Sequence, residues 1–249
     1  MHPVWRWFHQ MGSPPYFYAF STRWMPWFGG LALILGAIGI YKGLFIAPAD
    51  YLQGESFRII YIHVPSAWMS LFIYLLMAIN GAIALIWRIK LSEILLLSCA
   101  PIGAMFTAVT LLTGMLWGKP TWGTYWVWDA RLTSELVLLF LYFGVMALAA
   151  AYEDQRQGAR AAAVLALVGV VNIPIIHFSV HWWNTLHQGE TVRVFGETSM
   201  HGSMLWPLLI MALATKFYFA FALLLRARSM LLEQERGKQW AIEIAQGGR

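Results

Sequence analysis

Long apolar runs alternate with short polar connections along the whole chain of 249 residues. A bilayer core about 30 Å thick needs roughly 20 residues of helix at 1.5 Å per residue. Six runs reach that length, at residues 27–46, 65–87, 94–117, 132–152, 161–180 and 204–225. The pattern predicts an all-α integral membrane protein in which residues 1–249 form a single domain of six transmembrane helices.

Prolines mark one expected helix start and several expected bends. Pro65 suits the first turn of the second helix, where its missing N–H costs nothing, and this places His63 immediately outside the helix. Pro101, Pro174 and Pro207 fall inside later predicted helices. A bundle tolerates the resulting kinks because neighbouring helices satisfy the freed carbonyls.

The composition agrees with a membrane protein, since 59% of the residues are hydrophobic and only 12% are charged. A soluble domain carries about 25% charged residues. In a membrane protein, excess Lys and Arg residues set the orientation of the chain and contact anionic lipid. We attribute the net charge of +5 to this and expect no nucleic-acid partner. Residues 1–24 lack the apolar core and small-residue cleavage site of a signal peptide, and we expect no cleavage there.

The distribution of Lys and Arg predicts the orientation of the chain. Eleven lie in the N-terminal segment, the second and fourth connections and the C-terminal tail, against five in the first, third and fifth connections. The positive-inside rule then puts both termini and the tail at 226–249 in the cytoplasm. Charge alternating with apolar residues in that tail predicts a helix lying on lipid or on a partner. Segments 50–63, 118–131 and 181–203 share the external side.

The third connection, 118–131, is unusually aromatic. Trp122, Trp126, Trp128 and Tyr125 follow one another within seven residues. Their flat apolar faces, each with a hydrogen-bonding edge, suit a planar and partly polar ligand. The alternative is an interfacial belt, in which single aromatics are scattered near helix ends. In an extended chain Trp122, Trp126 and Trp128 share one face, and in a helix Trp122 and Trp126 share one face. The spacing therefore does not distinguish an extended connection from a helical one.

Histidines on the same external side point to haem, because a six-coordinate haem needs one imidazole on each face. His63 lies at the mouth of the second helix and His187 just beyond the fifth. A single histidine at a helix end is usually structural, but the aromatic connection between these two favours them as iron ligands. His177 and His181 are four apart without a third ligand at matching spacing, and we expect them to hydrogen-bond within the bundle. His201 is a weaker alternative ligand.

Haem also brings two propionates, which need cations at the wet rim of the site. Arg58 and Arg131 are the candidates, because the guanidinium fork binds carboxylates in a bidentate manner. The alternative to a propionate contact for Arg131 is a local ion pair with Asp129 or Glu135. Asp129 is expected to orient Arg131 or a Trp N–H. The lone Cys99 excludes a Cys-x-x-Cys-His attachment motif, so any haem is non-covalent, as haem b is.

The run Trp122-Gly-Thr-Tyr-Trp-Val-Trp-Asp-Ala-Arg131-Leu-Thr resembles the WWD signature of haem-handling proteins of cytochrome c biogenesis. Tyr125 stands where many relatives carry a further tryptophan, and its ring can also pack flat. Five further segments extend a resemblance to the cytochrome c maturation protein C (CcmC) family over nearly the whole chain: Ala47-Pro-Ala-Asp-Tyr, Arg58-Ile-Ile-Tyr-Ile-His63-Val-Pro, Ala100-Pro-Ile-Gly, Asn172-Ile-Pro-Ile-Ile-His177 and Trp182-Trp-Asn-Thr-Leu-His187-Gln-Gly. Residues 189–203 show no such correspondence.

This resemblance implies a function in haem delivery and not in bond-making chemistry. In the family, the WWD loop and two external histidines, here His63 and His187, hold haem at the periplasmic face of the bacterial inner membrane. The haem passes to the chaperone CcmE, with CcmD and the ABC transporter pair CcmA and CcmB as partners whose ATPase supplies the energy. This chain has no phosphate-binding loop of its own.

Two other functions remain as alternatives. A b-type cytochrome would carry electrons across the bilayer, but it usually holds histidine pairs at two depths, whereas this pair lies at one surface. A haem permease subunit would need a polar pathway, for which Asn80, Asn172 and Lys216 are the intramembrane candidates. Lys216 must snorkel, line the bundle interior or meet a partner chain, and the sequence leaves these three open.

Overall fold

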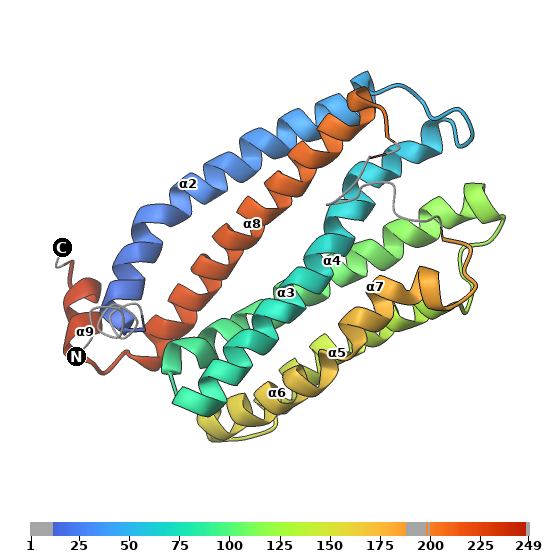
Figure 1. The fold of residues 1–249 in the computed structure, drawn as a ribbon. Coiled ribbons are helices and arrows are strands. Elements are labelled where there is room, and N and C mark those ends of the chain that lie inside the picture. The colour runs from blue at the N-terminus through green and yellow to red at the C-terminus, as the bar shows by residue number, and fades with distance from the viewer. Residues whose placement is uncertain (1–11, 188–197, 199, 248–249) are drawn as a thin grey trace.

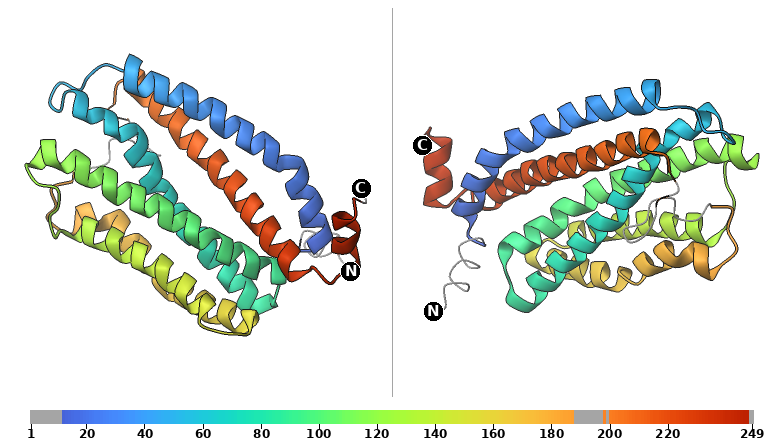
Figure 2. Two further views of the ribbon diagram at one scale, coloured as in Figure 1. Left: turned by 180° about the vertical axis from the view of Figure 1, so that it is seen from behind. Right: turned by 45° about the horizontal axis from the view of Figure 1, so that its top comes forward.

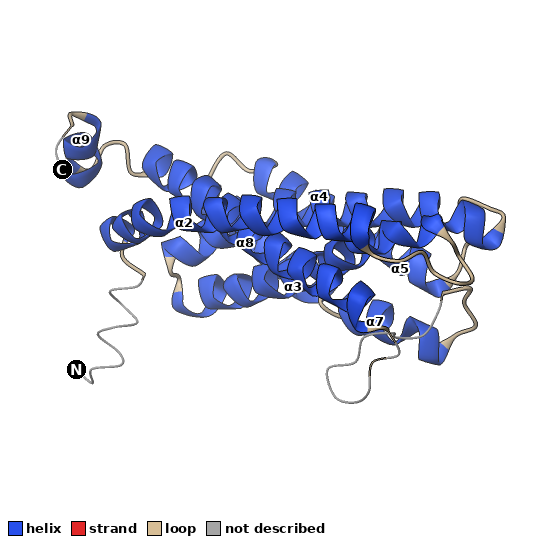
Figure 3. Ribbon diagram, turned by 90° about the horizontal axis from the view of Figure 1, so that it is seen from above, coloured by secondary structure: helices blue, strands red, loops and turns tan. Residues whose placement is uncertain are grey.

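The computed structural model describes residues 12–187, 198 and 200–247. Within this part of the chain all regular structure is helical (Figure 3), which confirms the all-α prediction. Six helical stretches are long and apolar enough to cross a membrane, as predicted: Pro14–Ile46, Glu55–Trp87, Lys90–Trp122, Ala130–Ala150, Gln155–Trp182 and Gly202–Gln234. The protein is a multi-pass membrane protein.

The described elements are helices and two short helical turns. Their bounds are α2 (Pro14–Tyr41), a π-helical turn η1 (Lys42–Ile46), a 3₁₀ turn η2 (Glu55–Ile59), α3 (Ile60–Trp87), α4 (Lys90–Trp122), α5 (Ala130–Ala150), α6 (Gln155–Gly169), α7 (Asn172–Trp182), α8 (Gly202–Gln234) and α9 (Gln239–Ala245). At 1.5 Å per residue the 33-residue helices α4 and α8 are each about 50 Å long.

Helices α2 and α8 form a pair beside a bundle of α3 to α7 (Figures 1 and 2). Helix α8 joins the two parts because it packs on α2 and also on α3 and α4. The start of α2 and helix α9 lie at one end of the molecule (Figure 1). The connections after η1, α4 and α7 lie at the opposite end, which brings segments far apart in sequence to one surface.

Small residues and buried polar contacts hold the bundle together. Gly103 of α4 lies so close to the Tyr142 ring of α5 that a Cβ would not fit. The Tyr142 hydroxyl donates to the Ser70 carbonyl on α3 at 2.7 Å, and the Ser70 hydroxyl donates to the buried Glu135 at 2.8 Å. Asn172, at the start of α7, donates to the Ser134 carbonyl on α5 at 2.9 Å. These contacts fix α3, α5 and α7 against one another.

The second span begins earlier than predicted. The η2 turn runs directly into α3, which starts at Ile60, so the prediction that His63 lies outside the helix is wrong. His63 occupies the first turn of α3, and Pro65 lies inside the helix. The helix continues through Pro65 because a proline this near the start removes only one backbone hydrogen bond.

The aromatic connection is shorter than predicted. Helix α4 continues to Trp122, so of the expected loop at 118–131 only residues 123–129 lie between helices. Gly123 ends α4 with a φ of 79° and donates to the Lys119 carbonyl at 3.0 Å. A left-handed residue of this kind is a common helix stop, and glycine adopts it without a Cβ penalty.

The fifth span is broken, and the last is longer than predicted. Helix α6 ends at Gly169 and α7 begins at Asn172, two residues before Pro174. Pro101 and Pro207 lie inside continuous helices. Helix α8 takes in residues 226–234 of the expected tail.

Helix α9 of the tail folds back onto the start of α2. The ring centroids of Trp240 and Tyr18 are 5.9 Å apart, and Arg228 donates to the Tyr18 hydroxyl at 2.7 Å. Glu235 forms an ion pair with Lys90. Burial opposes ionisation of Glu235, but the hydrogen bond and charge of Lys90 hold the pKa of this carboxyl below its usual value. The tail is thereby attached to the ends of α2 and α4.

Candidate functional site

The candidate site lies where α3 and α5 begin and α4 and α7 end. We call this region the aromatic end, comprising His63, residues 113–131 and residues 182–187. It is the end of the bundle opposite α9 (Figure 1). The predicted site residues other than Arg58 fall within it.

His63 packs against α4 in a defined orientation. Its ring meets the Trp117 ring edge-on at 5.6 Å, and its Nδ1 lies 3.0 Å from the Thr113 hydroxyl oxygen. That hydroxyl donates its one proton to the Val109 carbonyl at 2.6 Å, so it accepts from His63. The proton therefore sits on Nδ1, which leaves the Nε2 lone pair of His63 available for a metal.

His187 is oriented in the same way from the other side of the site. Its ring meets the Trp122 ring at 4.8 Å. Nδ1 lies 3.3 Å from a carboxylate oxygen of Asp129 and 3.2 Å from the Thr185 hydroxyl. Because the Thr185 hydroxyl itself donates to Asp129, both oxygens accept from the His187 ring. Its proton also sits on Nδ1, and Nε2 is again the free lone pair.

Asp129 links the helix start to the histidine. One carboxylate oxygen caps α5 by accepting from the Leu132 N–H at 2.8 Å, while the other receives His187 and Thr185. Partial burial raises the pKa of Asp129, but the hydrogen bonds from His187, Thr185 and Leu132 outweigh it and lower the pKa to about 2. The sequence predicts that Asp129 orients Arg131 or a tryptophan N–H. The hydrogen bond with His187 is a contact that the sequence does not predict.

The two imidazoles contact α4 at different turns of the helix. His63 contacts α4 at Trp117 and His187 contacts it at Trp122, a rise of roughly 7.5 Å for five helical residues. Arg131 and His187 both lie close enough to interact electrostatically with His63. Both histidines and Arg131 therefore lie in one region at the Trp122 end of α4.

The aromatic residues form separate contacts, and not one stack. Trp122 is the last residue of α4, whereas Trp126 and Trp128 lie in the non-helical connection with ring centroids 5.3 Å apart. Trp128 is 78% exposed. Tyr125 is exposed and lies under the Lys119 ammonium at 5.2 Å. Trp122 is thus helical, whereas Trp126 and Trp128 lie outside the helices.

Trp126 has an unsatisfied polar group. Its Nε1–H is buried and has no hydrogen-bond partner among the described residues. Buried N–H groups are nearly always paired, since leaving one unpaired costs free energy. A donor of this kind in the aromatic connection suits an acceptor on a ligand, such as a carboxylate.

Arg58 is directed elsewhere. It donates to the Gly43 carbonyl at 3.0 Å and pairs with Glu55, so within the described chain its contacts connect η2 to η1. Arg131, in the first turn of α5, is the arginine that the structure brings to His63.

The other histidines in the described part of the chain differ from this pair. His201 caps α8, and its Nδ1 accepts from the Ser203 N–H at 3.3 Å. This places its proton on Nε2, the opposite tautomer from His63 and His187. His177 and His181 lie exposed on α7. Among the described residues no group of three His, Cys, Asp or Glu side chains could hold a bare metal ion.

Thr113, Gly114 and Thr185 are residues that sequence reasoning missed. Thr185 lies two residues before His187, a spacing that allows a local hydrogen bond and was its only signal. Thr113 and Gly114 carry no signal, because their contact with His63 arises only when α3 packs on α4.

Gly114→Ala is expected to weaken severalfold the binding of the haem that the sequence predicts. A Cβ at this position lies 3.1 Å from Cε1 of His63, which forces the imidazole away from α4. The haem that copurifies with the variant measures the effect. Gly36→Ala on α2 is the matched control, because a Cβ there meets nothing within 4 Å and should change nothing. Equal haem content in Gly114→Ala and wild type would show that the fit of His63 to α4 is unimportant.

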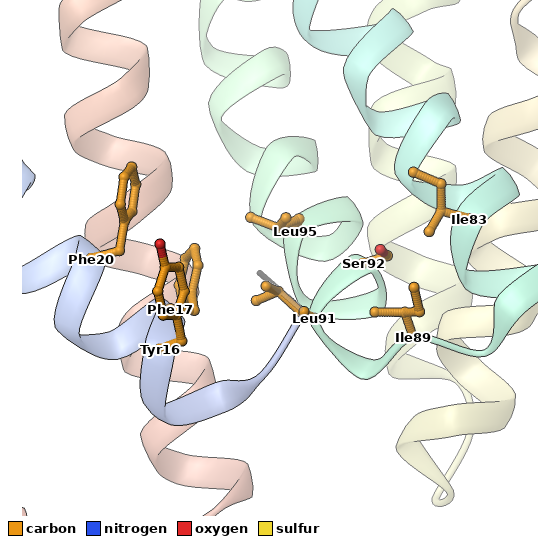
Figure 4. Close-up of a pocket in the computed structure, with 9 residues that line it drawn as sticks. Tyr16, Phe17, Phe20, Ile83, Ile89, Leu91, Ser92 and Leu95 are labelled. Atoms are coloured by element: carbon orange, nitrogen blue, oxygen red, sulfur yellow. The ribbon is translucent and has the colours of Figure 1, made fainter. Parts of the chain in front are cut away.

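A separate apolar pocket of about 250 Å³ lies at the other end of the molecule. Phe17 and Phe20 of α2 line it together with Leu91 and Leu95 of α4, near the Ile89 turn (Figure 4). It lies at the end where α2 begins and contains none of the predicted site residues.

Comparison of the sequence with known proteins identifies similar proteins and a matching family. The family model "CcmC: Heme exporter protein C" matches residues 7–242. "Heme exporter protein C" of Haemophilus influenzae is 45% identical over 243 residues, covering 98% of this chain and 99% of the relative. The protein of the same name from Escherichia coli K12 is 46% identical over 242 residues, covering 97% of each. A "Putative cytochrome c biosynthesis ccmC-like mitochondrial protein" of Marchantia polymorpha is 44% identical over 219 residues, covering 88% of this chain and 93% of the relative.

Proposed function

The chain belongs to the heme exporter protein C (CcmC) family, and on that premise we propose that it binds non-covalent haem b at the aromatic end and delivers it to the chaperone CcmE. Membership places the protein in haem export and cytochrome c biogenesis, as a transport component and not a known enzyme. The observation that carries the proposal is the matched orientation of two histidines, each with its proton held on Nδ1 and its Nε2 free.

Each residue of the site has a task in this proposal. His63 and His187 supply the axial nitrogens for the haem iron. Thr113 and Asp129 hold these rings in the required tautomer. Trp122 packs on His187 and restricts its ring.

In this proposal the 123–129 connection contacts the flat face of the haem, and the arginines contact its propionates. Trp126, Trp128 and Tyr125 offer flat surface to the ring, and the unpaired N–H of Trp126 donates to a propionate. Arg131 neutralises propionate charge. Arg58 joins it once released from Glu55, to which it is now paired. Haem is the cargo here, and the chain's work is to bind, orient and display it.

For localisation we propose the bacterial inner membrane, with both termini in the cytoplasm and the aromatic end in the periplasm. Six spans put the start of α2 and helix α9 on one side (Figure 1), and the excess of Lys and Arg on that side supports the cytoplasm. A reporter enzyme active only in the periplasm, fused into the 123–129 connection, tests this orientation.

The family name implies a complex of Ccm proteins. We propose CcmE as the haem receiver and CcmD, CcmA and CcmB as membrane partners, with the ATPase of that transporter supplying the energy. Membrane lipid surrounds the spans, and nothing in the site calls for nucleic acid.

The two alternatives gain no specific support from the structure. A transmembrane b-type cytochrome needs a second histidine pair at another depth, and the described histidines all lie toward the aromatic end. A permease pathway needs polar groups facing one another. Asn80 donates to the Leu76 carbonyl of its own helix, Asn172 donates to α5, and Lys216 is exposed on the outer surface.

The absorption spectrum of the purified full-length chain tests the proposed function. We expect the spectrum of a six-coordinate, low-spin haem, because two imidazoles share the iron. Acidified organic solvent should extract all of this haem, since no thioether holds it. A chain that takes up no haem when supplied with it, or one that keeps haem through extraction, would contradict the proposal.

A further inference from the structure

Lys216 lies at the middle of the membrane. It stands in the apolar stretch 204–225 of α8, which ends where Arg226 and Arg228 begin the polar part of the helix. At 1.5 Å per residue Lys216 is about 18 Å from Met204 and about 14 Å from Leu225 along the helix. The hydrocarbon core is about 30 Å thick, so the ammonium group lies near its centre.

The side chain of Lys216 faces away from the bundle. The three residues that follow it, Phe217, Tyr218 and Phe219, contact aromatic rings on α2, α4 and α3 respectively. Lys216 itself is exposed, and it makes no hydrogen bond or ion pair with the part of the chain that the structure describes. The ammonium group of Lys216 therefore does not lie in the bundle interior.

The Lys216 side chain is too short to bring its ammonium group to the membrane surface by snorkelling. Side chains on a helix tilt toward its N-terminus, and for α8 this is the more distant surface, about 18 Å away. A lysine stem is much shorter than that distance. Lipid phosphates lie beyond the hydrocarbon, so an anionic headgroup does not reach the ammonium either. An unpaired charge at this depth is costly, and such residues normally pair within the membrane.

Lys216 belongs to an exposed stripe on α8. Trp206, Leu209, Leu213 and Lys216 follow at spacings of three, four and three residues, which places them on one face of the helix. The three apolar members are 66%, 37% and 46% exposed. This three-four spacing is the pattern by which one helix packs along another.

A second exposed stripe runs beside it on α3. Trp68, Phe72, Leu75 and Ile79 are all exposed at spacings of four, three and four. Phe72 contacts Phe219 of α8 at 6.1 Å, so the two stripes border each other. Together they form one apolar face containing a single charge, which we call the α8–α3 face.

We propose that the α8–α3 face docks a membrane-spanning helix of another protein, and that this helix carries an Asp or Glu at mid-membrane depth paired with Lys216. The charge of Lys216 selects the chemistry of the partner, and the two apolar stripes supply the packing surface. This surface is separate from the aromatic end and does not depend on the haem proposal.

A second copy of this chain does not fit the requirement. In the described spans, Glu55, Glu93 and Glu233 lie near span ends. Glu135 is buried and hydrogen-bonded to Ser70. None of them presents an exposed carboxylate in the middle of the membrane, so the partner is a different protein.

Photo-crosslinking in intact cells tests the docking. A benzophenone amino acid replaces Leu213 in the full chain, and the same probe at Leu112, 61% exposed on α4, is the control. We expect a discrete protein adduct from position 213. Lys216→Met should lower its yield at least about tenfold while Lys216→Arg retains it, and the Leu112 probe should respond to neither change. Equal yield in Lys216→Met and wild type, an adduct with lipid alone, or an adduct with a second copy of this chain would overturn the proposal.

Charge exchange tests the pairing itself. The crosslinked peptide identifies the partner helix and any carboxylate within one turn of the linked residue. Lys216→Glu alone should abolish the adduct, and the same change combined with Lys at the partner's acidic position should restore it. A partner helix without a carboxylate at that depth, or no recovery in the double exchange when both chains are inserted in the membrane, contradicts the pairing.

Discussion

His63→Ala and His187→Ala are each expected to reduce the haem that copurifies with the protein by at least about tenfold. Loss of a group that merely supports a metal ligand typically costs 10- to 100-fold in affinity, and these residues are the proposed ligands themselves. The remaining haem should show a five-coordinate spectrum, and added imidazole should restore the six-coordinate one. Haem content per chain and the absorption spectrum measure both effects.

His181→Ala is the matched control for these variants. His181 lies near the same end of the bundle but is exposed on α7, so its loss should leave haem content and spectrum unchanged. If both ligand variants kept the wild-type spectrum and haem content, the assignment of His63 and His187 to the iron would be wrong.

Asp129→Asn is expected to lower haem retention by about tenfold, because an amide no longer holds the proton on Nδ1 of His187 as firmly as a carboxylate. Asparagine still caps a helix well, so α5 should remain stable. Asp129→Ala removes the cap as well and should cost a further 1 kcal/mol or so of stability. Comparing haem content with the thermal unfolding midpoint in detergent separates the two roles.

The pH dependence of stability provides a second measurement on Asp129. The pKa of this carboxyl falls from 3.8 to about 2 in the folded protein, so its stabilising contribution is complete above pH 3.8 and is lost as the pH falls toward 2. The stability difference between wild type and Asp129→Asn should follow the same course. Asp154 is the matched control, because it caps α6 through the Arg156 N–H at 2.8 Å and has no part in the site. A loss of haem in Asp154→Asn equal to that in Asp129→Asn would refute the specific role.

The six spans were predictable because hydrophobicity over about 20 residues is set by the bilayer itself. Their ends were not. Lys119 and Pro120 predict a loop, yet the helix runs past them until Gly123 allows a left-handed stop. Pro65 predicts a helix start, yet η2 had already begun the turn. At both positions the backbone hydrogen bonds of the helix continue through residues whose polarity or proline ring predicts a helix end.

The sequence indicates the two candidate histidines more clearly than the contacts that hold them. His63 and His187 stand out because both lie at predicted helix ends on the same surface as the aromatic connection. Thr113 contacts His63 across 50 positions of sequence, and no pattern within either segment encodes that contact. The same holds for Asp129, whose partner His187 is 58 residues away. Pairings of this kind are fixed by how the helices pack.

The length of α4 has a consequence for the proposed delivery. Its roughly 50 Å exceed the 30 Å of hydrocarbon, and its apolar part ends at Trp117. The last turn of α4, with Trp122 against His187, therefore stands clear of the acyl chains. In the proposed delivery the receiver therefore meets the haem in the aqueous phase, and the transfer requires neither of them to enter the lipid.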